Sequence, residues 1–291
     1  MAVMHKLLAL GLSLPLLACV VGSDATTGDD GTGGGGTGPG TGPGGTGDTA
    51  VHITSSMTVP AAYSVAAKTI VDPGVTLTIP AGATVKFAAG TSIEVLGTVL
   101  VQGTKTSPVQ LAPATAGDHH EGFSIPAGGT LTMSYGVQVG GGIEVSGDTL
   151  TVSDSLMSQS LGDFLVLGAG KVTVSYSAIG LEPGTGTDSI HCNMHFGGTG
   201  TTTSVTHSNI YGSPYGIMLY GGTSNDLTSN NWIGNGIQVD TQPGIVGDVS
   251  NGFFDKNPPT AMAGATLTRN NLAPTRLPAA TTDPVNGTGP R

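Results

Sequence analysis

A short phrase occurs three times in the chain: VTHSNI at 205–210, LTSNNW at 227–232 and VSNGFF at 249–254. The three copies begin 22 residues apart in both intervals. A repeat of this length is one supersecondary unit, which buries its apolar face only by stacking on the next copy. The phrase therefore predicts a solenoid. It specifies an architecture and names no substrate.

The repeat extends beyond the three clear copies. Its equivalent strand starts are Met133, Val152, Val174, Val205, Leu227, Val249 and Leu267. Five positions after each start from Val152 onward the residue is apolar, from Met157 to Leu272, and we expect it to point inward. Three positions after the start the residue is small or turn-forming: Ser155, Ser177, Ser208, Asn230, Gly252 and Asn270. We expect these side chains to hydrogen-bond from coil to coil at a corner.

Composition favours an all-β protein with many tight turns. The 291 residues include 49 Gly, and charged residues are only 10% of the chain. Helix formers such as Lys, Glu and Arg are scarce, whereas Thr, Val and Ser abound. The net charge of −10 argues against nucleic-acid binding and against electrostatic docking on anionic lipid. An acidic polysaccharide would need a bridging divalent cation.

The N-terminus predicts a secreted lipoprotein. Residues 1–18 read as a signal peptide, because the apolar run is too short to span a bilayer and Pro15 interrupts it. The sequence LLAC at 16–19 resembles the bacterial lipobox, which implies cleavage before Cys19 and a diacylglycerol on its sulfur. The alternative is ordinary signal cleavage beside an incidental Cys. Val20 replaces the Asp of inner-membrane retention, which favours the outer membrane of a bacterial cell envelope.

Four segments follow from these patterns. After the signal peptide, we expect residues 19–50 to be a disordered Gly/Thr/Pro linker that begins with the lipidated Cys. Residues 51–273 form the solenoid, and 274–291 form an irregular tail. Arg269 and Arg276 lie near this end, and we expect them to help cap it.

The first part of the solenoid carries a family resemblance. Residues 75–87 alternate apolar and polar on both sides of a Pro-Ala-Gly corner, and 92–104 do the same around Gly97. The run TLTIPAGATVKF, IEVLGTVLVQGT and PVQLA resembles the opening coils of bacterial right-handed parallel β-helix proteins, the pectin-lyase-like group. The match covers roughly residues 58–112. It implies a right-handed parallel β-helix of about ten coils, and it is weak for function.

The sequence favours a non-catalytic role. Polysaccharide lyases and hydrolases on this fold need clustered carboxylates on an outer face, and lyases also need a basic residue. The second strand of each coil predicts an outward column that is not an acidic row: Glu144, Leu165, Met218 and Gln238. Lys171 is the only Lys or Arg between Lys105 and Lys256. We therefore expect a structural, adhesive, carbohydrate-binding or partner-binding surface protein. The alternative is a polysaccharide lyase or glycoside hydrolase.

One interval, from Val174 to Val205, is 31 residues long and carries the most distinctive loop. The loop includes HCNMH, which places His191, Cys192 and His195 within five residues. Zn²⁺ or copper could use these donors. The plainer interpretation is a binding loop with a partly buried free Cys, and on that interpretation no metal or cofactor is expected. His119-His120-Glu121 is a similar but weaker cluster.

A hydroxyl side chain follows every strand start. The column is Ser134, Ser153, Ser175, Thr206, Thr228, Ser250 and Thr268. If these residues point outward, they form a ladder that could contact a glycan. Ice-binding solenoids use paired Thr columns, whereas this is one mixed column. The alternative is that small hydroxyl residues simply suit exposed strand positions.

Overall fold

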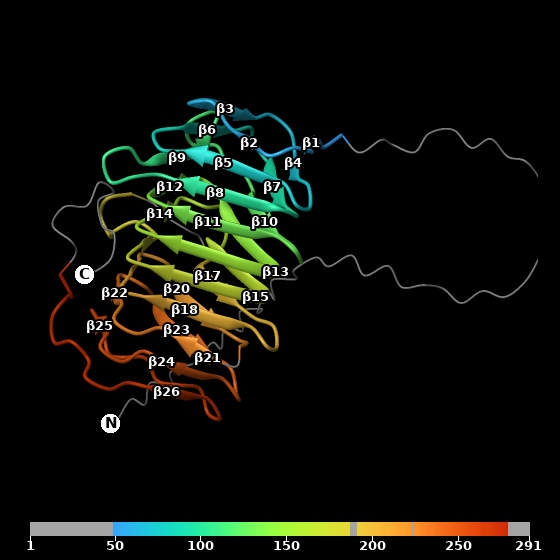
Figure 1. Cartoon of the computed structure of the whole chain (residues 1–291). Coiled ribbons are helices and arrows are strands. Elements are labelled where there is room, and N and C mark those ends of the chain that lie inside the picture. The colour runs from blue at the N-terminus through green and yellow to red at the C-terminus, as the bar shows by residue number, and fades with distance from the viewer. Residues whose placement is uncertain (1–48, 187–190, 223, 279–291) are drawn as a thin grey trace, which may run out of the picture. The chain divides into compact units, whose positions relative to one another are not determined.

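A computed structural model describes residues 49–186, 191–222 and 224–278. These residues form strands and no helix, and the predicted all-β class is confirmed as a parallel β-solenoid of about ten turns (Figure 1). The predicted signal peptide, Cys19, most of the linker and the tail from 279 onward lie outside the described residues. Within the described ranges, no helix has the length and apolar character of a membrane span.

Each full turn contributes one strand to each of three parallel ladders. Ladder A1 contains β1 (Val51–Ile53), β4 (Thr69–Val71), β7 (Ser92–Val95), β10 (Gly122–Ile125), the first parts of β13 (Gly142–Ser153) and β15 (Leu165–Ser175), β17 (Cys192–Phe196), β20 (Tyr215–Leu219) and β23 (Ile237–Thr241). Ladder A2 contains β2 (Met57–Thr58), β5 (Thr76–Pro80), β8 (Thr98–Gln102), β11 (Thr130–Ser134), the second parts of β13 and β15, β18 (Thr202–Thr206), β21 (Ser224–Asp226), β24 (Val246–Asp248) and β26 (Thr266–Thr268).

Ladder B forms a separate sheet. Its strands are β3 (Ala62–Val65), β6 (Thr84–Phe87), β9 (Val109–Pro113), β12 (Gly136–Val139), β14 (Leu156–Ser158), β16 (Ala178–Ile179), β19 (Asn209–Tyr211), β22 (Asn231–Ile233) and β25 (Phe253–Phe254). Every inner strand is paired on both sides. The backbone donors and acceptors of the ladders are therefore satisfied without a helix.

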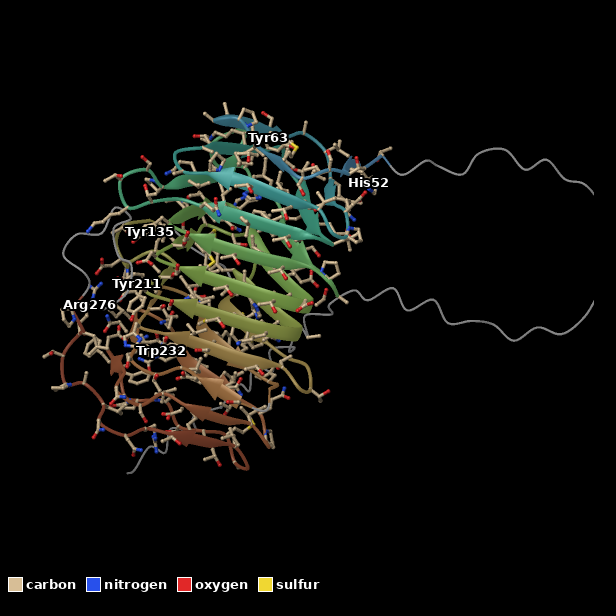
Figure 2. All side chains as sticks on the ribbon, in the orientation of Figure 1. His52, Tyr63, Tyr135, Tyr211, Trp232 and Arg276 are labelled. Carbon is tan, nitrogen blue, oxygen red and sulfur yellow. The ribbon has the colours of Figure 1, made fainter. Side chains whose placement is uncertain are left out.

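Alternation along each strand builds the core. In β11, for example, Leu131 and Met133 are fully buried, and the residues that alternate with them face outward: Thr130, Thr132 and Ser134. Trp232 is the largest fully buried side chain (Figure 2), and its ring stacks on Phe254 at 5.9 Å between centroids. Gly216 is required beside it, because an added Cβ would lie 2.6 Å from the carbonyl oxygen of Gln238 and 3.1 Å from the Trp232 ring.

The predicted register holds for six of the seven strand starts. Met133, Val152, Val174 and Val205 pair directly, one coil after another. The seventh start, Leu267, is wrong: it pairs with Gly247, so Arg269 is the residue equivalent to Val249. A shift of two residues keeps the same side chains inward, so apolarity alone does not separate the two registers. Leu267 packs instead over the space that Gly247 leaves open.

The predicted polar corner forms a buried hydrogen-bonded ladder. The backbone N–H of each corner residue donates to the side-chain oxygen of the corner residue in the next coil. Every side chain in this ladder from Ser155 to Asn230 is buried. The bonds run from Gly136 to Ser155 (2.9 Å), Ser155 to Ser177 (3.2 Å), Ser177 to Ser208 (3.2 Å) and Ser208 to Asn230 (2.8 Å). The ladder ends at Gly252, which has no side chain to offer. Asn270 is not a member, because the last coil follows the corrected register.

The residue just before each ladder position adopts a left-handed conformation. These residues are Tyr135, Asp154, Tyr176, His207, Ser229, Asn251 and Asn271, with φ between 48° and 59°. Such a conformation costs a non-glycine residue roughly 1–2 kcal/mol. The buried hydrogen bonds of the corner must therefore hold it in place. A single turn geometry is thus repeated seven times along the solenoid.

The C-terminal segment runs back along ladder B instead of capping the end. Leu277 exchanges two backbone hydrogen bonds with the side chain of Asn231, at 2.8 and 3.0 Å. Arg276 pairs with Glu182 at 2.5 Å, and it also donates to the hydroxyl of Tyr211 (Figure 2). The expected capping role of Arg276 is therefore wrong. Arg269 does stay near the last coil, where it donates to the carbonyl oxygen of Pro259.

Candidate functional site

The outer face of ladder A1 carries the candidate site. Its outward column consists of Glu94, Ser124, Glu144, Val166, His195, Met218 and Asp240, which pair in register across seven strands. The column predicted from the sequence was wrong at Leu165 and Gln238. Leu165 is fully buried and Gln238 is nearly so, because a slip of one residue moves a side chain to the other face. The true column carries three carboxylates and an imidazole.

Two hollows border this column. The first has a volume of 440 Å³, and its polar lining includes His119, Glu121, Glu144 and Asp163. The second has a volume of 490 Å³ and is lined by Asp240 and Lys256, among others. In the column, His195 and Met218 lie between them. The four coil steps from Glu144 to Asp240 correspond to about 19 Å along the solenoid.

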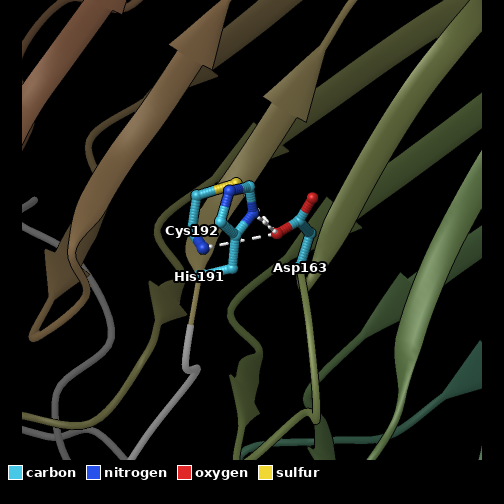
Figure 3. A group of neighbouring side chains, drawn as sticks. All are labelled: Asp163, His191 and Cys192. Carbon is cyan, nitrogen blue, oxygen red and sulfur yellow. Dashed lines mark hydrogen bonds and ion pairs between the residues drawn. The ribbon is translucent and has the colours of Figure 1, made fainter. Parts of the chain in front are cut away.

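Asp163 is the centre of a cluster beside the first hollow (Figure 3). Its Oδ1 atom lies 2.8 Å from Nδ1 of His191 and accepts hydrogen bonds from the thiol of Cys192 at 2.9 Å and from the Cys192 backbone N–H at 3.3 Å. Its Oδ2 atom lies 3.4 Å from Nδ1 of His195. The cluster is partly open, since the His191 side chain is 34% exposed whereas Cys192 is fully buried.

The ladder itself brings the cluster together. Leu165 of β15 pairs with Met194 of β17, and two residues earlier in each segment this brings Asp163, just before β15, beside Cys192. The N–H of Phe164 donates to the carbonyl oxygen of Asn193 at 3.1 Å and fixes this approach. The predicted loop residues His191, Cys192 and His195 are thus close in space. The sequence did not reveal Asp163, because 28 residues separate it from His191.

The charge of Asp163 is set by its partners. Burial on its own would raise the pKa of this carboxyl group. Hydrogen bonds with His195, Cys192 and His191, together with the charge of His191, outweigh burial and lower the pKa to about 2. Asp163 therefore stays ionised near neutral pH. A carboxylate held in this state is a poor proton donor, which weakens any case for it as a general acid.

Two tyrosines stand next to the cluster on the same face. The ring of Tyr215 lies 6.0 Å from that of His191, and the ring of Tyr220 lies 5.5 Å from that of His195. The hydroxyl of Tyr220 donates to Asp240 at 2.5 Å. Burial, and then this hydrogen bond, raise the pKa of Tyr220. Aromatic rings and ionised groups therefore share one strip of ladder A1.

The second His cluster from the sequence divides between core and surface. His120 is buried and stacks on Phe87 at 4.1 Å between ring centroids, and its Nε2 atom lies 3.0 Å from the carbonyl oxygen of Val139. Burial lowers the pKa of His120, so it is neutral near pH 7. All three residues line the first hollow. His119 and Glu121 are the more exposed of the three, whereas the His120 ring is packed into the core.

The hydroxyl residues expected to form a ladder differ in their surroundings along ladder A2. Ser153, Ser175 and Thr206 pair in register and are half-buried. Thr228 donates to Asp226, whereas Ser250 is buried and accepts a bond from the N–H of Asn270. Thr268, which was also expected, belongs to another column. Ladder A2 also carries two parallel Thr-rich columns that were not expected from the sequence, and they include Thr132, Thr151, Thr173, Thr130, Thr149 and Thr202.

Asp163 should make the fold sensitive to acid. The pKa of its carboxyl group is about 2 in the folded chain, against an ordinary value of 3.8. As the pH falls, Asp163 is therefore protonated in the unfolded chain before it is protonated in the folded chain. The resulting stabilisation, about 2 kcal/mol, is complete above about pH 4 and is lost as the pH falls through about 2. We expect the free energy of unfolding of Asp163→Asn to fall less between about pH 4 and pH 2 than that of the parent chain. Denaturant titrations at each pH, with a chelator present, measure this difference.

The matched control is Asp118→Asn, which removes a carboxylate from an exposed turn. It should lose stability in acid to the same extent as the parent chain. If Asp163→Asn loses as much stability as the parent chain between about pH 6 and pH 2, the Asp163 carboxylate does not stabilise the fold in this way.

Comparison with family models, curated proteins and solved structures found no match. What the chain shows is the parallel β-solenoid itself. The resemblance to pectin-lyase-like proteins stays an expectation from the sequence.

Proposed function

We propose that this chain is a cell-envelope lipoprotein whose β-solenoid binds an extended polysaccharide without cleaving it. The observation that carries the proposal is the pair of hollows on one outward column of ladder A1. A site drawn out along the solenoid over about 19 Å suits several units of a polymer better than one small molecule. The resemblance of LLAC at 16–19 to a lipobox supports the envelope location and the membrane anchor at Cys19.

The groups along this column suit sugar hydroxyls. Glu144 and Asp240 offer carboxylate oxygens as acceptors, and Lys256 offers a donor in the second hollow. Tyr215 and Tyr220 supply rings with an apolar face and a polar tip on the same strip. The excess of carboxylates favours a neutral or basic glycan over an acidic one.

A non-catalytic role agrees with the chemistry of the first hollow. The Lys or Arg base that we expect of a lyase on this fold is not among its described lining residues. Asp163 is held ionised and is unsuited to donate a proton. The alternative, a glycoside hydrolase, rests on a specific observation: Glu121, Glu144 and Asp163 line the same hollow.

Binding to insoluble polysaccharides and to a glycan array tests the proposal with the purified full-length chain. We expect Glu144→Gln to weaken retention by about tenfold, because one charged hydrogen-bond acceptor is lost. Thr151→Ala, on the outer face of ladder A2, is the matched control and should bind normally. Palmitate labelling of Cys19→Ala tests the anchor, and unchanged labelling would contradict it.

Reaction products decide between the two functions. The same glycans, incubated with the chain, should release neither reducing ends nor unsaturated uronates. Product release that disappears in Glu144→Gln would establish the hydrolase alternative instead. Absence of binding to every glycan would contradict the proposed function.

A further inference from the structure

We propose that Asp163, His191 and Cys192 form a zinc-binding site, with His195 as the adjacent fourth donor. One donor atom from each of the first three residues lies within 4.8 Å of the others. Tetrahedral zinc places neighbouring donors roughly 3.3–3.8 Å apart, so the observed spacing needs only small side-chain movements. This inference does not depend on polysaccharide binding.

The donor set matches zinc in chemical character. It combines a carboxylate oxygen, an imidazole nitrogen and a sulfur, which zinc accepts together in protein sites. The two anionic donors, Asp163 and the Cys192 thiolate, would balance the charge of Zn²⁺ in a half-buried place. Calcium and magnesium, which require oxygen donors, do not fit this set.

The backbone holds the donors before any metal arrives. Cys192 lies in β17, and Asp163 lies two residues before β15 begins, so the pairing of these two strands restricts the separation of the two side chains. Behind the cluster, the side-chain amide of Asn193 donates to the carbonyl oxygen of Tyr211 at 2.8 Å and to Asn235 at 3.3 Å. A site built on paired strands is positioned more rigidly than one on a free loop.

Metal binding has a definite proton balance. The thiol that donates to Asp163 loses its proton to solvent when sulfur binds the metal. His191 binds as the neutral tautomer, with its proton on the ring nitrogen that does not face the metal. Affinity should therefore rise with pH. The partly exposed imidazoles, 34% for His191 and 29% for His195, leave a path from solvent to the site.

Titration of the full-length chain with Zn²⁺ and Co²⁺ tests the site after chelator treatment under reducing conditions. We expect one equivalent of Zn²⁺ by calorimetry and a thiolate-to-cobalt charge-transfer band with Co²⁺. Cys192→Ser should abolish the band and weaken Zn²⁺ binding by more than about tenfold, and His191→Gln should also weaken it. The matched control is His52→Gln, since His52 forms another His–Asp pair, 2.7 Å from Asp72, in an exposed place.

A second measurement tests the site without any substitution, in case the Cys192 or His191 variant does not fold. In the unaltered chain, Zn²⁺ should protect Cys192 from alkylation, as read by mass spectrometry of the peptide that contains it. The proposal is overturned if the unaltered chain binds no Zn²⁺ saturably. It is also overturned if the Co²⁺ band persists in Cys192→Ser, or if His52→Gln removes binding as fully as His191→Gln does.

Discussion

Trp232→Ala is expected to lower the free energy of unfolding by about 3–5 kcal/mol. The side chain is fully buried and stacks on Phe254 with the two rings nearly parallel. Gly216 faces the same ring, and its strand pairs with its neighbours, so the cavity cannot easily collapse. For a domain of this size the loss corresponds to a fall in Tm on the order of 10 °C. Denaturant titration and thermal melting both measure it.

Val246→Ala is the matched control for this substitution. Val246 is 54% exposed, so removing its methyl groups should change stability by less than about 0.5 kcal/mol. Equal losses in the two variants would mean that the inside of the solenoid is packed loosely near Trp232. That outcome would contradict the core described for ladders A2 and B.

Asn230→Ala is expected to cost about 2–4 kcal/mol, although the side chain is polar. Its Oδ1 atom accepts from the N–H of Ser208 at 2.8 Å. Its Nδ2 atom donates to the carbonyl oxygens of Val205 and Leu227. Alanine leaves these groups without this partner in a place that water does not reach, because Asn230 is fully buried.

Asn257→Ala provides the comparison for Asn230. Asn257 is exposed, and its replacement should leave stability within about 0.5 kcal/mol. Asn230→Asp is the sharper test. It preserves the acceptor but removes both donors and buries a charge, so it should be at least as destabilising as alanine. Stability equal to that of the parent chain in either variant at position 230 would show that the polar corner does not hold the coils together.

The fold was predictable because its signal is periodic. Alternation set the inward residues of strands such as β11, and the 22-residue spacing set the coil length. The polar corner at Ser155, Ser177, Ser208 and Asn230 also followed from the repeat. The error at Leu267 has the same origin, since a shift of two residues preserves the alternation that located the other starts.

The candidate site was predictable only in part, because it depends on register between neighbouring coils. The long interval before Val205 and its HCNMH run indicated His191, Cys192 and His195 as candidates. The central residue, Asp163, lies in an irregular segment one coil earlier, where no repeat position identifies it. Likewise, the sequence predicted Leu165 on the outer column, where the structure has Val166. Because of this error, the sequence did not indicate that Glu144 and His195 belong to the same column.

The uniform corner has an evolutionary consequence. Each coil from β11 to β22 offers its neighbour the same donors and acceptors, so duplication or loss of one whole coil leaves both new contacts satisfied. Lineages can thus change the length of the solenoid without redesigning its interior. Duplication or loss of a coil elsewhere leaves the cluster of Asp163, His191 and Cys192 intact, whereas a change between β15 and β17 disrupts it. A coil inserted there would separate the carboxylate from the thiol by another strand spacing.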